Sequence, residues 1–178
     1  MTSPPESKER QQIIELVEKL ETINPEPKPL ASDAINGEWR LRWTTSESIL
    51  GRNRMRGFRV DLDRPILQEI DAKNLKARNV EPITTFRWIL GGVRYTNNVE
   101  AALTPVSESK VVVQFKKFNL FGGILSFNAP ERARGELDTT YLDTGIVCDV
   151  DGSRGDSIRI SRGDRGNIFV LTKASAGN

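Results

Sequence analysis

Carboxylates are the side chains of this sequence with the most obvious capacity for chemistry. Asp138 with Asp143, and Asp149 with Asp151, lie close enough in sequence to be considered as general acid–base pairs. Neither spacing matches an established catalytic arrangement, so solvated strand and turn positions are the favoured interpretation. A calcium loop built on Asp149, Asp151 and Asp156 is rejected, because the full ligand pattern with its terminal bidentate glutamate is missing. We predict no catalytic residues.

The histidine and cysteine content restricts the chemistry further. The 178-residue chain contains no histidine and a single cysteine, Cys148. Histidine is the commonest general base and metal ligand, and one cysteine can neither complete an internal disulfide nor build a zinc site. Cys148 stands between apolar residues and is expected to be a small core residue. We therefore predict a protein that is not an enzyme and that needs no metal or other cofactor.

Four arginines are crowded into one short segment, although the net charge of the whole chain is only +2. One interpretation is a solvated loop. The other is contact with an anionic membrane surface, to which each basic residue contributes about 1 kcal/mol. Binding to nucleic acid is not expected, because no aromatic stacking platform is interleaved with these arginines. The predicted membrane-contact residues are Arg52, Arg54, Arg56 and Arg59.

Aromatic side chains on predicted strands are the candidates for binding an apolar ligand. Each one taken singly is more simply a core residue, but together in a barrel they would line an interior pocket. Burying about ten ligand methylenes would contribute on the order of 8 kcal/mol, which corresponds to roughly micromolar affinity before other costs. The predicted ligand-binding residues are Trp39, Trp43, Phe115, Phe118, Phe121, Tyr141 and Phe169.

Apolar and polar residues alternate along the segments that would position these side chains. Residues 39–43 and 158–161 show the period of two that is typical of strands with one wet face. Residues 163–167, rich in Gly, Asp and Asn, predict a hairpin turn into residues 168–171, whose unbroken apolar run is expected where both faces are covered. Many short strands at even spacing predict a mainly β fold, an antiparallel up-and-down barrel of about eight strands.

A helix is predicted ahead of the strands. Ser3 and Glu6 have the spacing of a capping box, and the apolar residues from Ile13 to Leu20 recur at helical spacing. The helix either docks on the outside of the domain or plugs one end of the barrel. We predict a helix and proline-rich linker over residues 1–30 and a β domain over residues 31–178. No apolar run approaches the roughly 20 residues needed to cross a bilayer, and no export signal or transit peptide is recognised.

Four stretches of the sequence resemble the plastid lipid-associated protein family, also called fibrillins or plastoglobulins, of plants, algae and cyanobacteria. These stretches are residues 37–51, 113–122, 129–143 and 157–172. The resemblance implies a lipocalin-like barrel that binds apolar lipids: isoprenoids, carotenoids, prenylquinones or fatty acids. It also implies a peripheral location at thylakoid or plastoglobule-type membranes of a plastid, or inside a cyanobacterial cell, and a link to photoprotection. An enzyme of lipid or prenylquinone metabolism is a further partner that it suggests.

The chain departs from the family pattern in two places. Residues 144–156 intervene where the family usually continues directly into the Arg-Ile-Ser-Arg-Gly segment, and residues 88–98 fit the pattern poorly. Both segments could reshape a pocket mouth. Two hypotheses remain: a barrel that holds an apolar ligand at a lipid surface, or a structural coat or scaffold whose barrel is filled by side chains. In either barrel the first and last strands should be neighbours, with Phe169 or Arg159 near Trp39 or Trp43.

Overall fold

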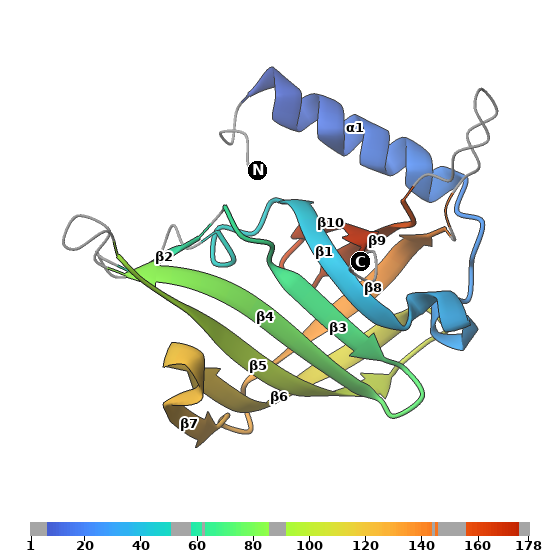
Figure 1. Cartoon of the computed structure of the whole chain (residues 1–178). Helices are drawn as coiled ribbons and strands as arrows, with labels where there is room; N and C mark the ends of the chain where they lie inside the picture. Colours follow the sequence, from blue (N-terminus) through green and yellow to red (C-terminus); the bar gives the residue numbers. More distant parts are fainter. Residues whose placement is uncertain are drawn as a thin grey trace.

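The backbone winds into an antiparallel β-barrel with a helix packed on its outer face (Figure 1). The computed structural model describes residues 7–50, 58–61, 63–85, 92–143, 145 and 156–174. The helical elements are α1 (Lys8–Thr22), η1 (Pro29–Ala31), η2 (Asp33–Ile35) and η3 (Phe121–Gly123). The strands are β1 (Gly37–Thr44), β2 (Phe58–Val60), β3 (Leu67–Asp71), β4 (Lys76–Thr85), β5 (Val93–Pro105), β6 (Lys110–Leu120), β7 (Leu125–Asn128), β8 (Arg134–Leu142), β9 (Ile158–Gly163) and β10 (Ile168–Lys173).

Eight strands form the closed ring of the barrel, in the order β1, β3, β4, β5, β6, β8, β9 and β10. Each strand pairs with the next in chain order, and β10 returns to pair with β1, so the predicted up-and-down topology is confirmed. In the last pairing Trp39 lies opposite Lys173 and Thr44 opposite Phe169. Two short strands stand outside the ring (Figure 1). Strand β2 pairs with the end of β4, and β7 pairs with the end of β6.

The strand register of the ring shifts at three places, and two of these β-bulges decide the face of an aromatic side chain. The register between β1 and β10 shifts between Leu41 and Trp43, and that between β8 and β9 shifts between Thr139 and Tyr141. A bulge adds one residue to one strand and so reverses the faces of the residues beyond it. Trp39 therefore packs in the interior core, whereas Trp43 packs with the residues under α1. The simple alternation expected along β1 ends at this bulge.

The interior core is closed at one end by the two short 3-10 turns, η1 and η2. Ile35 is buried there, and its carbonyl oxygen accepts a hydrogen bond of 2.8 Å from the indole nitrogen of Trp39. Leu30 of η1 packs against the same cluster. The segment between the helix and the first strand thus covers one end of the barrel. The buried members of this core are Ile35, Trp39, Ile70, Leu103, Val111, Leu142 and Leu171.

Helix α1 lies across the outer face of the barrel, near β8, β9 and β10 (Figure 1). Its buried residue Val17 packs with outward-facing side chains of four strands: Trp43, Tyr141, Ile160 and Ile168. Of the two positions predicted for the helix, docking on the domain is therefore the one observed. Among the described residues, no helix is long and apolar enough to cross a membrane.

The helix begins later than the sequence suggested. It starts at Lys8, and the hydroxyl of Ser7 accepts a hydrogen bond of 3.2 Å from the backbone nitrogen of Arg10. Ser7 is therefore the N-cap of α1. Ser3 and Glu6, for which a capping box was predicted, lie outside the described residues.

The hairpin of β9 and β10 follows its prediction closely. The backbone nitrogen of Gly163 donates to the carbonyl of Asn167 at 2.9 Å, and Gly166 supplies a left-handed turn position with φ of 69°. Along β10, Ile168 and Val170 face α1, while Phe169 and Leu171 face the interior core. The uninterrupted apolar run is explained because α1 covers the outer face of this strand.

Candidate functional site

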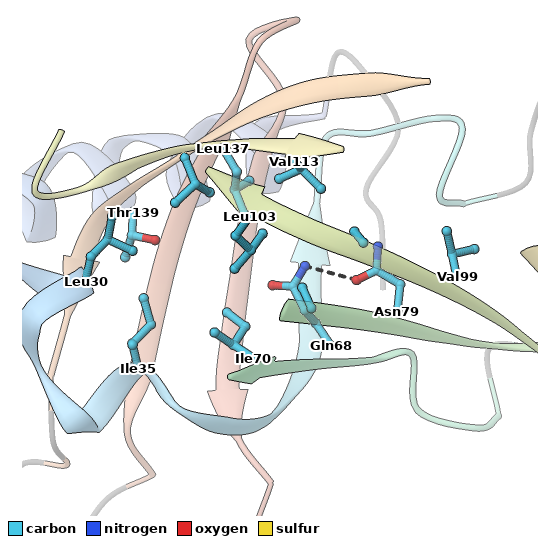
Figure 2. Close-up of a pocket in the computed structure, with 13 residues that line it drawn as sticks. Leu30, Ile35, Gln68, Ile70, Asn79, Val99, Leu103, Val113, Leu137 and Thr139 are labelled. Atoms are coloured by element: carbon cyan, nitrogen blue, oxygen red, sulfur yellow. Dashed lines mark hydrogen bonds between the residues drawn. The ribbon is translucent and has the colours of Figure 1, made fainter. Parts of the chain in front are cut away.

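A small cavity of about 30 Å³ lies inside the barrel (Figure 2). Because one ordered water needs roughly 10–15 Å³, the space suffices for about two waters. Its walls come from β3, β4, β5, β6 and β8, with η1 and η2 at one end. The lining residues are Leu30, Ile35, Gln68, Ile70, Ala77, Asn79, Val99, Ala101, Leu103, Val111, Val113, Leu137 and Thr139.

Polar side chains occupy one region of this otherwise apolar interior. The amide nitrogen of Gln68 donates to the amide oxygen of Asn79 at 3.0 Å, as Figure 2 shows. The amide oxygen of Gln68 accepts a hydrogen bond from the Nη2 atom of Arg159. Nearby in the fold, the hydroxyls of Thr139 and Ser161 lie 3.4 Å apart. The cavity therefore borders a hydrogen-bonded network that ends on a cation.

The guanidinium of Arg159 is completely buried and lies 4.9 Å from the centre of the Trp39 ring. Its Nε and Nη1 atoms have no hydrogen-bond partner among the residues that the structure describes. Burial lowers the pKa of Arg159 to about 9, so the group remains mostly protonated at neutral pH. A desolvated cation with two unused donors is costly, because water no longer solvates it and no anion replaces the water.

A second cation lies over the same tryptophan ring. The ammonium nitrogen of Lys173 is 4.9 Å from the centre of the Trp39 ring and donates to the carbonyls of Ala34 and Asn36, each at 2.6 Å. Burial, and then the charge of Arg159, lower the pKa of Lys173. Within the described part of the chain, neither cation forms an ion pair with a carboxylate, so this end of the interior is electropositive.

The seven aromatic residues predicted to bind ligand fall into three places. Trp39 and Phe169 belong to the interior core, and Trp43 and Tyr141 lie outside the ring under α1. The other three are on or next to β6. The ring centre of Phe118 lies 6.2 Å from that of Phe115 and 5.4 Å from that of Phe127 in β7, on which it stacks. The ring centres of Phe121 and Tyr95 are 5.1 Å apart. The cavity is lined by none of the seven predicted residues Trp39, Trp43, Phe115, Phe118, Phe121, Tyr141 and Phe169.

Aliphatic residues, which the sequence analysis did not single out, make most of the cavity wall. A signal for them exists in the sequence, since Val99, Ala101 and Leu103 alternate along β5, and Val111 and Val113 along β6. In a narrow eight-stranded barrel, smaller side chains leave the space that larger ones would fill.

An apolar hairpin projects from the barrel wall at the end of β6. We use this name for residues 118–128, which comprise the end of β6, η3 and β7 (Figure 1). Ile124 is 91% exposed, Leu125 48% and Phe127 45%. The turn between them is possible because Gly122 and Gly123 adopt left-handed φ angles of 70° and 96°. Contiguous exposed apolar residues of this kind mark an interaction surface.

The charges around the apolar hairpin are mainly basic. Lys116 and Lys117 precede it and are exposed, and no acidic residue occurs between Glu108 and Glu131. The nearest acidic contact is on β5, where the carboxylate of Glu100 accepts a hydrogen bond from Asn119 at 3.0 Å. The composition of the surface is therefore suited to an apolar layer bordered by anionic groups.

The predicted membrane-contact arginines can be placed only in part. Arg52, Arg54 and Arg56 lie outside the described residues, and Arg59 is in β2 opposite Thr84. Thr84 lies in turn opposite Arg94, and the next residue, Tyr95, contacts Phe121 of η3. Thus β2 and the apolar hairpin lie at the same end of the barrel. The sequence reasoning identified the basic segment but missed the exposed Ile124, Leu125 and Phe127.

Of the acidic residues considered for catalysis, Asp143 has a structural role, whereas Asp149 and Asp151, like Cys148, lie outside the described residues. The carboxylate of Asp143 accepts hydrogen bonds from the Tyr141 hydroxyl at 3.0 Å and from the backbone nitrogens of Gly145 at 2.9 Å and Ile158 at 3.0 Å. Asp143 therefore joins the two ends of the intervening segment 144–156. Among the residues that the structure describes, no three His, Cys, Asp or Glu side chains are grouped so that they could hold a metal ion.

Comparison with known proteins gives one family and several relatives. The family model described as PAP_fibrillin matches residues 3–172. The chain is 32% identical over 160 residues to "Probable plastid-lipid-associated protein 5, chloroplastic" of Arabidopsis thaliana, covering 89% of this chain and 57% of that protein. It is 28% identical over 202 residues to "Chromoplast-specific carotenoid-associated protein, chromoplastic" of Cucumis sativus, covering 92% of this chain and 60% of that protein.

A third relative is "Plastoglobulin-1, chloroplastic" of Pisum sativum, 27% identical over 199 residues, covering 94% of this chain and 55% of that protein. The chain thus spans less than two thirds of the length of each of these relatives. No solved structure gives a significant match.

Proposed function

The chain belongs to the PAP_fibrillin family, and we propose that it is a non-enzymatic protein of plastid lipid particles or membranes, which it contacts from one end of its barrel. The apolar hairpin is the observation that carries this proposal. Its exposed side chains Ile124, Leu125 and Phe127 would enter the apolar layer, while Lys116 and Lys117 would face anionic headgroups. The names of the plastid-lipid-associated and plastoglobulin relatives support the same location.

The arginine-rich segment would strengthen this contact. Arg59 lies at the same end of the barrel as the apolar hairpin, and Arg52, Arg54 and Arg56 precede it by a few residues. Electrostatic attraction of this kind weakens with salt, whereas insertion of apolar side chains does not. Thylakoid membranes, photoprotection and an enzyme partner of lipid or prenylquinone metabolism stay predictions from the family resemblance.

Co-sedimentation with vesicles tests the proposal. The protein should sediment with vesicles that contain an anionic lipid, and less with purely zwitterionic ones. Raised salt should reduce binding to the anionic vesicles to the level of the zwitterionic ones and no further. A protein that stays in the supernatant with both vesicle types contradicts the proposal.

We further propose that the interior of the barrel accepts an apolar chain, as an isoprenoid, carotenoid, prenylquinone or acyl lipid would provide. The apolar wall formed by β5, β6 and β8 supports this proposal. The cavity of about 30 Å³ is too small for such a chain, so Leu30 and Ile35 would have to move away from the end that they cover. Both side chains come from 3-10 turns rather than from strands of the ring, so their displacement would leave the barrel pairing intact.

A filled barrel with a purely structural role, as a coat or scaffold on lipid particles, is the second candidate. The small cavity favours it. Native mass spectrometry of the gently purified protein, together with analysis of its organic extract, distinguishes a ligand-binding barrel from a filled one. A copurifying lipid in one-to-one ratio supports ligand binding, whereas vesicle binding without any bound lipid supports the structural role.

A further inference from the structure

We infer that the barrel recognises an acidic amphiphile: a long-chain carboxylic acid whose carboxylate pairs with Arg159 while its chain follows the apolar wall of the cavity. This inference rests on the proposed binding of an apolar chain and specifies which of the candidate lipids fits. A hydrocarbon carotenoid has no hydrogen-bond acceptor for a buried cation, and a prenylquinone offers carbonyl oxygens but no negative charge.

The first argument is that Arg159 is buried without a full set of hydrogen-bond partners among the described residues. Its side chain is fully buried, and in the described part of the chain two of its nitrogen atoms, Nε and Nη1, have no hydrogen-bond partner. Other arginines of the barrel have carboxylate partners; Arg162, for example, is 2.7 Å from a carboxylate oxygen of Glu21. Buried guanidinium groups are normally paired with an anion. Nε and Nη1 point to different sides of the guanidinium and do not form one fork, so the missing partner is an anion that reaches at least one of these two nitrogens.

The second argument is the charge of the surroundings. Lys173 lies over the same Trp39 ring as Arg159, and its hydrogen bonds go to the backbone carbonyls of Ala34 and Asn36. Both cations lack an acidic partner among the described residues. A barrel filled only for stability would gain nothing from a fully buried guanidinium beside a second, partly buried cation, since apolar residues of similar volume would serve better. A bound anion would neutralise them.

The third argument is the connection between the cation and the cavity. Gln68 lines the cavity and accepts a hydrogen bond from Arg159, so the guanidinium lies directly behind the cavity wall. Apart from Gln68, Asn79 and Thr139, the wall is apolar (Figure 2). A polar end followed by an apolar wall is the arrangement that a molecule with a carboxylate and a hydrocarbon tail requires.

Ordered water is the alternative that the test must separate. The cavity of about 30 Å³ has space for about two waters, and these could hydrate Arg159 without any ligand. Water would give no preference for an acid over a neutral molecule with the same chain.

The test compares palmitic acid with methyl palmitate, which has the same chain but no negative charge. Binding to the whole protein is followed by the fluorescence of the tryptophans and by competition with a fluorescent fatty acid. The unmodified protein should bind the acid at least about tenfold more tightly than the ester, as expected when one charge-assisted pair is gained. Arg159→Met should remove this preference while leaving the affinity for the ester unchanged.

Arg78→Met is the matched control, because Arg78 is an exposed arginine that pairs with Glu69 on the surface. It should keep the preference for the acid. The inference is overturned if the unmodified protein binds acid and ester equally, a result that needs no variant to fold. It is also overturned if Arg159→Met, shown to be folded by circular dichroism, keeps the preference.

The two proposals fail in different ways. Equal binding of acid and ester contradicts only the carboxylate inference and leaves an apolar pocket in place. Binding of neither molecule contradicts both the inference and the proposed interior ligand, whatever the vesicle experiment shows.

Discussion

Arg162 in β9 and Glu21 in α1 are joined by two hydrogen bonds of 2.7 Å each, although 141 residues separate them in sequence. The hydroxyl of Thr140 donates to the same carboxylate at 2.6 Å. This polar contact lies beside the apolar cluster around Val17 and fixes α1 at one position on the barrel. The stability of the helix against the barrel can therefore be tested at a single residue.

Replacement of Glu21 by Ala should lower the free energy of unfolding by about 1–2 kcal/mol, because charge-assisted hydrogen bonds from Arg162 and Thr140 are lost. Urea denaturation measures the change. Glu15→Ala is the control, since Glu15 is an exposed residue of the same helix and loses the same atoms. Equal effects of the two substitutions would show that the contact with Arg162 contributes nothing.

The contribution of Glu21 should depend on pH. Burial raises the pKa of this carboxyl, but the hydrogen bonds from Arg162 and Thr140 outweigh burial, and the net shift is downward from 4.5. The stabilisation is therefore fully present above the pKa of the unfolded chain and is lost as the pH falls through the lower pKa of the folded protein. The unfolding midpoints of the unmodified protein and Glu21→Ala should differ at neutral pH and converge in acid. A difference that stays constant in acid contradicts this assignment.

The stabilisation by Tyr141 should be lost as the pH rises, opposite to that by Glu21, which is lost as the pH falls. Burial and the hydrogen bond to Asp143 raise the pKa of its hydroxyl to about 12. Stability from this group is fully present below the unfolded pKa of 10.0 and is lost as the pH rises through the folded value. Tyr141→Phe should cost about 1–3 kcal/mol at neutral pH, because Asp143 loses a buried donor. Thermal unfolding at several alkaline pH values should show this difference shrinking above pH 10.

Filling the cavity should separate ligand uptake from contact with a lipid surface. Ala101 lines the cavity, and Ala101→Phe should abolish uptake of a fluorescent fatty acid at a stability cost of about 1–3 kcal/mol from overpacking. Binding to anionic vesicles should be unchanged. Trp43→Phe is the control, because Trp43 lies outside the ring under α1 and its replacement should leave uptake unaltered. Uptake that survives Ala101→Phe would place the ligand elsewhere.

The apolar hairpin should account for vesicle binding that survives high salt. The double substitution Ile124→Ser with Leu125→Ser should reduce the vesicle partition coefficient at least about tenfold, since each apolar side chain contributes roughly 1.5–3 kcal/mol when fully buried. Unfolding midpoints should hardly change, because both residues are exposed.

Leu75→Ser with Val106→Ser is the matched control for that experiment. Both residues are exposed and lie in turns at the opposite end of the barrel, where the backbone nitrogen of Leu103 donates to the carbonyl of Leu75 at 2.8 Å. This variant should bind vesicles normally. A similar loss in both variants would mean that the protein has no preferred lipid-facing end.

Strands with clear alternation, such as β1 and β9, were predictable from that pattern, whereas the short β2 falls partly in the segment that was predicted to be an arginine-rich loop. The pairing of β1 with β10 and the contact of Arg159 with Trp39 confirm predictions made from the sequence. The bulges in β1 and β8 could not be predicted from alternation, because one added residue does not change the composition of a strand. Each bulge nevertheless reverses the face of the aromatic residue beyond it, Trp43 in β1 and Tyr141 in β8. Exposure of Ile124 was equally hidden, since an apolar residue in a strand-rich sequence is normally expected in the core. The division at residue 30 stays a prediction.

The pairing of the first barrel strand with the last has a consequence for how the protein folds. The hydroxyl of Thr44 donates to the carbonyl of Ile168, 124 residues away, so the ring closes only across almost the whole length of the domain. Contacts between such distant segments require a loop closure with a large entropy cost, and this makes folding slow. During synthesis, β1 leaves the ribosome long before its partner strand β10 has been made, so the tryptophans of β1 cannot yet be buried by this pairing. We therefore expect slow refolding, with a late step in which closure of the ring and docking of α1 occur together.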